Sequence, residues 1–298
     1  MKKKMMFIYN AHEEKARIRS KLVEIIEVFV QAGYEITVMP MQKQGDAIAF
    51  VREKEEYFEL VVCSGSDVTL TEAITGMLQC KHKVPIGYIP CGSTNDLARG
   101  LKIPSNMVKA AHTAAVGDVF AYDVGRFNGE IFLYAAAFAL FTDVSCEVRR
   151  EMKSVHDRML FLLEKMKRQT KIKSYHLKVR FDDVEIEDDF VFGTITNSRT
   201  LGGFRRITGQ DVALDDGLFE VILVKLPKSL FEIRKTQVSL RTRIVDPTYI
   251  YCFKTSKVTF EATEEIPWTW DGESDAFYQK VEIENLNKAL EIKIPPKK

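Results

Sequence analysis

The stretch VVCSGSDVTLTEAITGM, residues 61–77, places small and acidic side chains between an apolar run and a helix-like pattern. The residues that could do chemistry there are Gly65, Ser66, Asp67 and Thr69. Main-chain N–H groups at such a strand-to-helix turn can bind a polyphosphate, and a carboxylate there can bind Mg²⁺ directly or through water. The same residues also fit an ordinary turn in which Ser or Asp caps the helix.

A second stretch of the same kind, IPCGSTNDLARG, occupies residues 89–100. Its small and polar residues follow another apolar run and precede another short helix-like segment; they are Gly92, Ser93, Thr94, Asn95 and Asp96. Arg99 then falls in the first helical turns, where a guanidinium can neutralise phosphate. The alternative is a capped helix with a solvated Arg99. Two such turns at neighbouring strand ends of one sheet favour a phosphate site more than either turn does alone.

The third stretch is WTWDGESDAFY, residues 268–278. Asp271 and Glu273 lie beside two tryptophans, and a carboxylate in an apolar setting is suited to act as a general base. Asp-Gly is also a common turn dipeptide. On these residues alone, a β-turn explains the stretch better than a catalytic base does.

The elements that must position the first two stretches alternate along the first third of the chain. Apolar runs of strand length are followed by segments of helical period, as in residues 15–33, where Gly33 ends the pattern. This order predicts a parallel sheet with helices on both faces. Ligands of such sheets bind beyond the carboxyl ends of the strands, so the loops after Tyr9, Cys63 and Pro90 are the informative ones.

The pattern changes near Phe120. Two strand-like runs flank Asn128-Gly129, a strong hairpin signal, and strand-like runs dominate from residue 175 onward. We expect an α/β protein with two domains. Residues 1–120 form a nucleotide-binding α/β domain, and residues 121–298 form a β-rich sandwich that binds substrate, with the last residues packing back on the first domain.

Composition excludes several classes of protein. The chain has 298 residues, of which 46% are hydrophobic, and a net charge of +1, which does not fit a dedicated nucleic-acid binder. The five cysteines are scattered without a metal-binding spacing, as in a reducing compartment. No run approaches the roughly 18 apolar residues of a membrane span. We expect a cytoplasmic protein that at most lies on the inner face of a membrane.

Taken together, the three stretches resemble the diacylglycerol kinase catalytic family, which includes bacterial lipid kinases and sphingosine kinases. Its Gly-Gly-Asp-Gly-Thr element is matched by GSDVT at residues 65–69, and its Pro-x-Gly-Thr-x-Asn-Asp-x-Ala-Arg element by PCGSTNDLAR at 90–99. LDDGL at 214–218 and WDGE at 270–273 resemble its later elements. The resemblance covers nearly the whole chain, with the elements in the family's order. It implies a fold related to NAD kinase and phosphofructokinase.

The resemblance implies ATP and Mg²⁺ as cofactors and assigns roles to single residues. The cofactor-binding residues would be Asn10, Lys15, Gly65, Ser66, Asp67, Thr69, Gly92, Ser93, Thr94 and Asn95. Asp271 would take the proton from the lipid hydroxyl, with Glu273 beside it. The active-site charge network would comprise Asp96, Arg99 and Asp123.

Two metal positions are implied by the same resemblance. Asp67 would handle the Mg²⁺ bound to ATP, and Asp216 with the carbonyl groups of Ala213 and Leu218 would form a structural Mg²⁺ site. In the implied reaction a lipid hydroxyl attacks the γ-phosphate, so the protein positions both partners, shields charge and accepts one proton. The product is of the phosphatidic-acid type.

Ser66 and Val68 stand where the family has glycines, and they motivate an alternative. A β-branched valine at a position that requires left-handed backbone would be strained, and its side chain could fill space needed by phosphate. The chain could then be a catalytically impaired pseudokinase that binds nucleotide or lipid. A third reading is a kinase of a soluble alcohol.

Segment 149–173 carries nine Lys or Arg against three acids, together with an apolar face. A basic amphipathic helix of this kind can lie on an anionic membrane, but it can equally pack on the second domain with a solvated basic face. Exposed β edges in the second domain also make a homodimer an expectation.

Overall fold

The computed structural model describes residues 2–10, 15–54, 57–92, 95–139, 173–198, 212–242, 245–271 and 274–296. It separates into two compact units. Unit 1 comprises Met1–Tyr122 and Lys288–Lys298, and unit 2 comprises Asp123–Asn287. Two strands, β5 (Asp118–Phe127) and β13 (Ser274–Ile294), contribute residues to both units.

Unit 1 is built on a parallel sheet. Its strands lie in the order β2-β1-β3-β4, and every neighbouring pair is parallel. The bounds are β1 Lys3–Asn10, β2 Tyr34–Met41, β3 Leu60–Gly65 and β4 Ile86–Pro90. The end of β13 extends this sheet, because Ile292 pairs with Ile86 in parallel.

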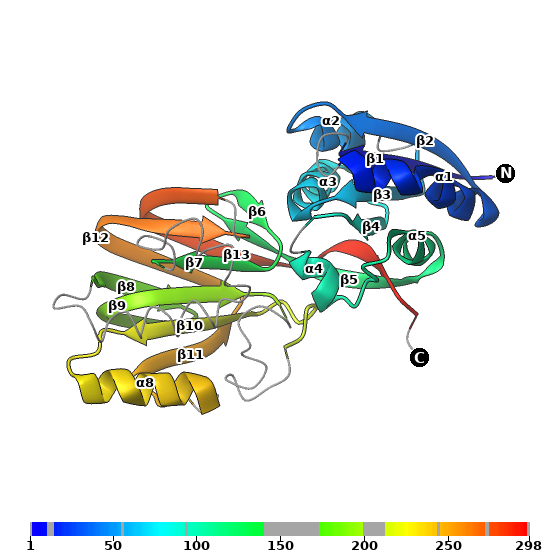
Figure 1. Ribbon diagram of the computed structural model, residues 1–298. Coiled ribbons are helices and arrows are strands. Elements are labelled where there is room, and N and C mark those ends of the chain that lie inside the picture. Colours follow the sequence, from blue (N-terminus) through cyan, green and yellow to red (C-terminus); the bar gives the residue numbers. More distant parts are fainter. Residues whose placement is uncertain are drawn as a thin grey trace. The chain divides into compact units, whose positions relative to one another are not determined.

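Helices cover both faces of this sheet, as Figure 1 shows. They are α1 Lys15–Gln31, α2 Asp46–Glu53, α3 Asp67–Gln79, α4 Asp96–Gly100 and α5 Met107–Val116. Helices α1 and α5 pack together on one face, and α2 and α3 pack together on the other. The apolar side chains of β1 and β3 are almost completely buried between these layers, which accounts for their uninterrupted apolar sequences.

The strand order reverses between β1 and β3. The chain moves from β1 outward to β2, and then crosses back to β3 and continues to β4. Open α/β sheets bind ligands beyond the carboxyl ends of the strands at such a reversal. The carboxyl ends of β1, β3 and β4 are Asn10, Gly65 and Pro90, so the two predicted phosphate turns begin at this edge.

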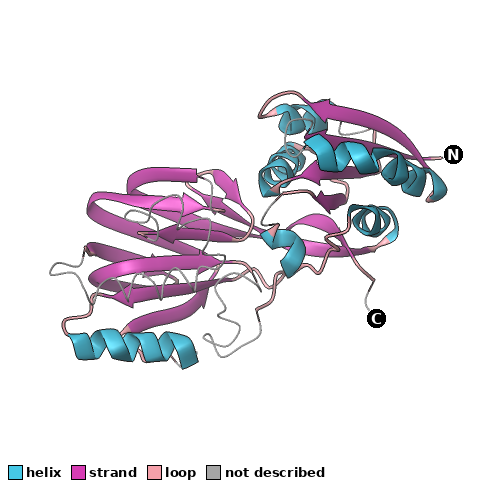
Figure 2. Ribbon diagram, viewed as in Figure 1, coloured by secondary structure: helices cyan, strands magenta, loops and turns pink. Residues whose placement is uncertain are grey.

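Unit 2 consists mainly of antiparallel strands, drawn in magenta in Figure 2. Besides parts of β5 and β13, its elements are β6 Glu130–Phe132, β7 Ala135–Phe138, β8 Tyr175–Phe181, β9 Val184–Thr196, β10 Phe219–Lys225, α8 Leu230–Thr242, β11 Ile250–Thr255 and β12 Lys257–Trp270. The strand order is β11-β10-β9-β7-β12-β13. The long strands β9 and β12 each pair with β7 over one part and with β8 over another. The predicted fold class, α/β followed by a β-rich region, is confirmed.

The predicted hairpin at Asn128-Gly129 is also confirmed. Both residues have left-handed backbone, with φ of 46° and 97°, and they join β5 to β6. Positive φ at both central residues is the geometry that two-residue hairpins require, and Asn-Gly adopts it at low cost.

The core of unit 2 is an aromatic cluster around Trp268. The ring centroids of Phe127, Phe138 and Phe260 lie 5.3, 5.1 and 5.0 Å from that of Trp268, which is 2% exposed. Trp268 is therefore a packing residue, and it fixes the end of β12 that leads into Asp271.

Two helices were not predicted from the sequence, α5 and α8. The predicted basic helix at 149–173 lies outside the described residues. Within the part of the chain that the structure describes, no helix has the length and apolar character needed to cross a membrane.

Candidate active site

The turn after β3 leads directly into α3. Ser66 precedes the helix with extended backbone, φ −76° and ψ 178°, and Asp67 is the first helical residue. Asp67 is only 5% exposed and Thr69 only 1%. A methyl group at Gly65 would lie 2.4 Å from the Thr69 Oγ1, so a glycine is needed for this helix to start so close to the strand.

The turn after β4 is closed by Asn95. Its side-chain Oδ1 accepts a hydrogen bond from Gly92 N at 3.1 Å, and its Nδ2 donates to Gly92 O at 2.6 Å. Asn95 itself has left-handed backbone, with φ of 49°, immediately before α4. Asparagine tolerates this conformation better than most residues, so Asn95 suits the position immediately before α4.

The two turns lie against each other and are joined by hydrogen bonds. Asp96 N donates to the Asp67 Oδ2 at 2.9 Å, and Cys91 N donates to Gly65 O at 2.9 Å. A methyl group at Gly92 would lie 2.9 Å from the Ser66 Cβ. The structure therefore brings the described parts of the two predicted phosphate-binding stretches together, and we call them the paired turns (residues 65–69, 91–92 and 95–99).

Tyr88 supports the paired turns from β4. Its hydroxyl lies 3.1 Å from Gly65 O, 3.2 Å from the Asp67 Oδ1 and 3.3 Å from the Asn95 Oδ1. The ring is 1% exposed, and a buried tyrosine hydroxyl needs a partner. The sequence analysis missed this residue. The only available signal was a tyrosine within an otherwise apolar strand that ends at the second turn.

The electrostatics of the paired turns centre on Asp67. Burial raises the pKa of the Asp67 carboxyl to about 6, and the charge of Asp96 adds to the rise, although the hydrogen bonds from Asp96 N and Tyr88 act in the opposite direction. Asp96 has its own cation, because Arg99 Nη2 lies 2.5 Å from its Oδ1. Asp67 is thus a buried acidic group whose ionised form would be stabilised by a cation.

The expected strain at Val68 is contradicted by the structure. Val68 lies in the first turn of α3 and is not among the described non-glycine residues with positive φ. Ser66 is extended. Neither position needs glycine for its backbone, because the turn enters the helix without passing through the left-handed region.

Asp271 occupies the turn between β12 and β13. Its Oδ2 accepts a hydrogen bond from Leu133 N at 2.7 Å, and its Oδ1 accepts from Tyr134 N at 3.0 Å and Ala135 N at 3.2 Å. The backbone of Asp271 is left-handed, with φ of 50°, and its N–H donates to Ala135 O at 2.8 Å. The predicted turn is present, and main-chain donors fix the orientation of its carboxylate.

Asp216 lies in the turn before β10, and Asp123 contacts this turn from β5. Asp123 is fully buried, and its Oδ2 accepts from Gly217 N at 2.6 Å. In the described residues, Asp123 therefore holds the 214–217 turn of unit 2, whereas Asp96 and Arg99 belong to unit 1.

The implied structural Mg²⁺ site fits poorly with these contacts. Asp216 Oδ1 accepts from Leu218 N at 3.1 Å, and its Oδ2 lies 3.3 Å from the Lys254 ammonium. Lys254 also lies 3.1 Å from the Glu220 Oε1, a carboxylate that is 3% exposed and whose pKa burial raises to about 7. A protein cation already stands beside Asp216. The metal assignment to Ala213, Asp216 and Leu218 stays a prediction, and Lys254 argues against it.

The remaining predicted site residues are Asn10, Lys15, Ser93, Thr94 and Glu273. Asn10 ends β1 and Lys15 begins α1, but the Lys15 side chain, Ser93, Thr94 and Glu273 lie outside the described residues. Within the described residues, no group of three or more His, Cys, Asp or Glu side chains could hold a metal ion. Nucleotide phosphates and water would be among the ligands of a Mg²⁺ at Asp67.

The fold and the paired turns define a class of protein: an α/β unit with polar turns at the sheet reversal, followed by a β-rich unit. Within this class, residues 4–127 match the family model of the diacylglycerol kinase catalytic domain. The amino-terminal part of the chain is therefore similar to that catalytic domain, and the resemblance predicted from the motifs is confirmed.

Similar proteins extend the likeness over the whole chain. The diacylglycerol kinase of Bacillus subtilis (strain 168) is 26% identical over 298 residues, covering 99% of this chain and 98% of the relative. That of Staphylococcus carnosus (strain TM300) is 28% identical and covers 92% and 89%. A crystal structure of a diacylglycerol kinase from Bacillus anthracis str. Sterne superposes with a TM-score of 0.78 at 23% identity, covering 98% and 97%. This last comparison shows a shared fold.

Proposed function

We propose that the chain is an ATP- and Mg²⁺-dependent lipid kinase. It transfers the γ-phosphate of ATP to the hydroxyl group of diacylglycerol or a related lipid, giving a phosphatidic-acid-type product. The observation that carries the proposal is the hydrogen bond from Asp96 N to the Asp67 carboxylate, which joins two polar turns at the carboxyl edge of a parallel sheet. The catalytic-domain match and the diacylglycerol kinases that align along the chain support it.

The paired turns would bind the nucleotide. Main-chain N–H groups at the start of α3 carry partial positive charge and suit phosphate oxygens. Asp67 would hold the metal, and Arg99, fixed by Asp96, would lie near phosphate charge. Gly65 and Gly92 allow Thr69 and Ser66 to pack directly against the main chain of the two turns.

Mg²⁺ fits Asp67 on the chemistry of the donor. The carboxylate is a hard oxygen ligand, it is buried, and its raised pKa reflects a negative charge that lacks sufficient compensation. When bound, Mg²⁺ would neutralise phosphate charge. The residues of this chain would keep the metal-binding carboxylate in position through Tyr88 and Asp96 N.

Asp271 would accept the proton of the lipid hydroxyl. Three main-chain N–H groups hold its carboxylate in one orientation, which suits a base that must meet a hydroxyl in a defined geometry. Glu273 and Asp123 keep supporting roles in this proposal, Asp123 through the 214–217 turn that it anchors.

Retained catalysis is favoured over the pseudokinase alternative by the backbone at residues 66–68. The valine and serine that replace family glycines occupy helical and extended conformations that suit them. The strain argument for an impaired loop is therefore removed.

Localisation and assembly are proposed as a consequence of the substrate. A kinase of membrane lipids that lacks a spanning helix in its described part would act from the cytoplasm, with peripheral contact to an anionic membrane. We also propose a homodimer, because β11 ends the strand order of unit 2 among the described residues. Sedimentation velocity would show a single monomeric species if this last proposal is wrong.

The test of the function is a radiolabelled ATP assay with a panel of acceptors. The panel comprises diacylglycerol, a sphingoid base and monoacylglycerol in mixed micelles, with glycerol as the soluble acceptor. We expect label in a lipid acceptor, dependent on Mg²⁺, and little in glycerol. Nucleotide binding without transfer to any acceptor would support the pseudokinase alternative, and transfer to glycerol alone would support a kinase of soluble alcohols.

A further inference from the structure

Helix α8 carries large apolar side chains on its outward face. Leu230, Phe231 and Val238 are 62%, 63% and 55% exposed. Arg234 and Lys235 are exposed between them. With 3.6 residues per turn, these five positions fall within an arc of about 140° around the helix. Exposed apolar side chains gathered on one face mark an interaction surface more often than isolated ones do.

The outward face is not needed to hold the helix on unit 2. The opposite face is buried through Ile233, Thr236 and Leu240, which are 3%, 0% and 0% exposed. The outward apolar residues therefore contribute little to packing within the described structure. Exposure of these apolar side chains to water is unfavourable, and contact with an apolar phase would remove that cost.

The outward face is basic as well as apolar. The Lys235 ammonium lies 5.4 Å from the centroid of the Phe231 ring. The one carboxylate within α8, Glu232, accepts a hydrogen bond from Lys228 N at 2.6 Å, and Glu232 N donates to the Ser229 Oγ at 3.2 Å. This reciprocal capping fixes the start of the helix and directs the acid to its own main chain.

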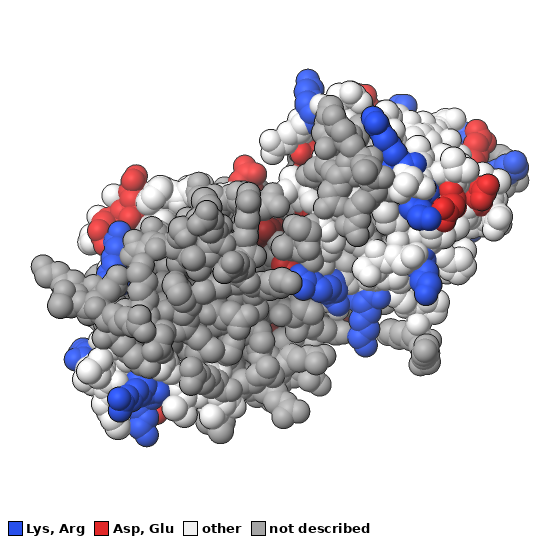
Figure 3. Space-filling model, viewed as in Figure 1, with Lys and Arg blue, Asp and Glu red and all other residues white. Residues whose placement is uncertain are grey.

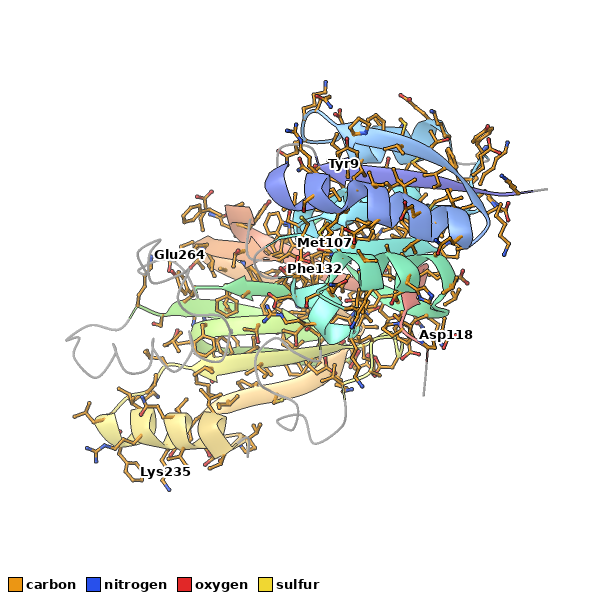
Figure 4. The ribbon with its side chains drawn as sticks, turned by 45° about the vertical axis from the view of Figure 1, so that its right-hand side comes forward. Tyr9, Met107, Asp118, Phe132, Lys235 and Glu264 are labelled. Atoms are coloured by element: carbon orange, nitrogen blue, oxygen red, sulfur yellow. The ribbon has the colours of Figure 1, made fainter. Side chains whose placement is uncertain are left out.

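A lysine and an aspartate lie close to the outward face of α8. Lys228 is exposed beside the first turn. Asp246 lies near Lys235, and its Oδ1 accepts a hydrogen bond from Thr248 N at 3.0 Å. Figure 3 shows basic side chains gathered over α8, at the lower left of the view. In Figure 4 the labelled Lys235 lies on the side of α8 that faces away from the strands of its unit.

We propose that the outward face of α8 docks unit 2 on an anionic lipid bilayer. Leu230, Phe231 and Val238 would enter the interfacial layer, while Arg234 and Lys235 would contact lipid phosphates. Basic amphipathic helices bind membranes in this way, by apolar burial together with attraction to anionic headgroups. The inference rests on the proposed function, because a kinase whose substrate lies in a bilayer must reach its surface.

Charge argues for a bilayer over a second copy of the chain. Two copies of this face brought together about a two-fold axis would place Lys228, Arg234 and Lys235 against the same three cations of the partner. Like charges in an interface are strongly unfavourable. An anionic surface complements both the apolar and the basic residues.

The test is co-sedimentation of the full chain with vesicles of phosphatidylcholine alone or mixed with phosphatidylglycerol. We expect binding only to the anionic vesicles, and weaker binding at high salt. Leu230→Ser with Phe231→Ser, and separately Arg234→Gln with Lys235→Gln, should each weaken binding about tenfold. The affected side chains are exposed, so melting temperatures should not change.

Matched controls replace exposed residues of the same chemistry elsewhere. Val119→Ser with Phe277→Ser removes side chains that are 47% and 62% exposed, and Arg52→Gln with Lys109→Gln removes two exposed cations of unit 1. Loss of binding no greater than in these controls would overturn the inference. Equal binding of the wild type to neutral and anionic vesicles would overturn it too, as would α8 variants that change the oligomeric state and leave vesicle binding unchanged.

Turnover of a short-chain, water-soluble diacylglycerol separates this inference from the proposed function. The α8 variants should retain that turnover while losing vesicle binding. If the wild type shows α8-dependent vesicle binding and no turnover of any acceptor, the docking surface stands and the kinase proposal fails. If turnover is normal and vesicle binding is independent of α8, the docking surface alone fails.

Discussion

Two aspartates of the molecule, Asp67 in unit 1 and Asp271 in unit 2, are held in contrasting ways. Asp67 is buried, accepts one main-chain N–H and lies within reach of the Tyr88 hydroxyl, and its pKa is raised to about 6. Asp271 accepts three main-chain N–H groups from Leu133 to Ala135. The first carboxylate is short of positive charge, and the second already faces several donors. This difference matches a metal ligand in one case and an oriented base in the other.

The largest expected effect is the loss of turnover in Asp271→Ala. Removal of a general base should lower kcat by roughly 10²–10⁴-fold, because proton transfer then depends on water. ATP binding by unit 1 should be unchanged. The measurement is initial-rate kinetics with diacylglycerol in mixed micelles, together with nucleotide titration.

Asp271→Asn distinguishes a base from a structural anchor. An amide keeps most of the volume but cannot take the proton, so we expect a loss close to that of the alanine variant. Tyr134→Phe, which removes the 2.7 Å hydrogen bond to Asp271 O and leaves the Asp271 carboxylate in place, is the matched control and should lose little. Turnover that survives in Asp271→Asn would show that the carboxylate acts through the turn alone.

The next effect concerns pH and Asp67. Its pKa is raised from 3.8 to about 6 in the folded protein, so the folded state binds more protons than the unfolded state between these values. The free energy of unfolding should therefore fall as pH rises from about 4 to 6, by roughly 3 kcal/mol in total for this group. Thermal unfolding across this range measures the change, and Asp67→Asn should remove it.

The Mg²⁺ dependence of turnover gives a second prediction about Asp67. Protons and metal compete for the Asp67 carboxylate, so the Mg²⁺ concentration that gives half-maximal turnover should rise as pH falls below about 6. Above that pH it should level off. A Mg²⁺ requirement that does not vary from pH 5 to 7 would contradict the assignment of Asp67 as the metal ligand, whatever happens at Asp271.

A smaller effect is expected from Gly92→Ala. The added methyl group would meet Ser66 at 2.9 Å and push the paired turns apart, at a cost of roughly 1–3 kcal/mol. We expect a higher KM for ATP, because the turns bind nucleotide together, with the Asp271 turn undisturbed. Ser66→Gly removes the Cβ that is struck, so the double variant should recover part of the loss. If the effects of Gly92→Ala and Ser66→Gly on KM are additive, the contact between these two residues does not couple the turns.

The sequence predicted unit 1 well because its strands and helices alternate with clear periods and sharp stops. It also predicted both polar turns. What it could not supply was the contact between them, since Asp96 N reaches Asp67 only after β3 and β4 pair in register. The same limit applies to Tyr88 and Lys254, whose roles depend on neighbours far along the chain.

The two missed helices have physical explanations. Helix α5, MVKAAHTAAV, buries mainly alanines, which give a weak periodic signal. Helix α8 departs from the usual pattern: Thr236, Gln237 and Ser239 are buried beside Ile233 and Leu240, while Leu230 and Phe231 are exposed. A pattern that assigns apolar residues to the core cannot detect such a helix. The exposed apolar residues that prevented the prediction of α8 are the same residues that suggest its contact with lipid.

The smallest expected effect is that of Val68→Gly. The structure places Val68 at the second position of α3, so a glycine there should reduce stability by roughly 0.5–1 kcal/mol, without relieving any strain. Val108→Gly is the matched control, because Val108 is also half-buried and second in its helix, α5. Melting temperatures of the two variants should fall by similar amounts. Turnover should change less than about threefold relative to wild type. A tenfold or greater gain in turnover in Val68→Gly, absent from Val108→Gly, would mean that the valine side chain blocks phosphate. The paired turns would then be impaired as the pseudokinase alternative expects, and the role of Asp271 would be unaffected.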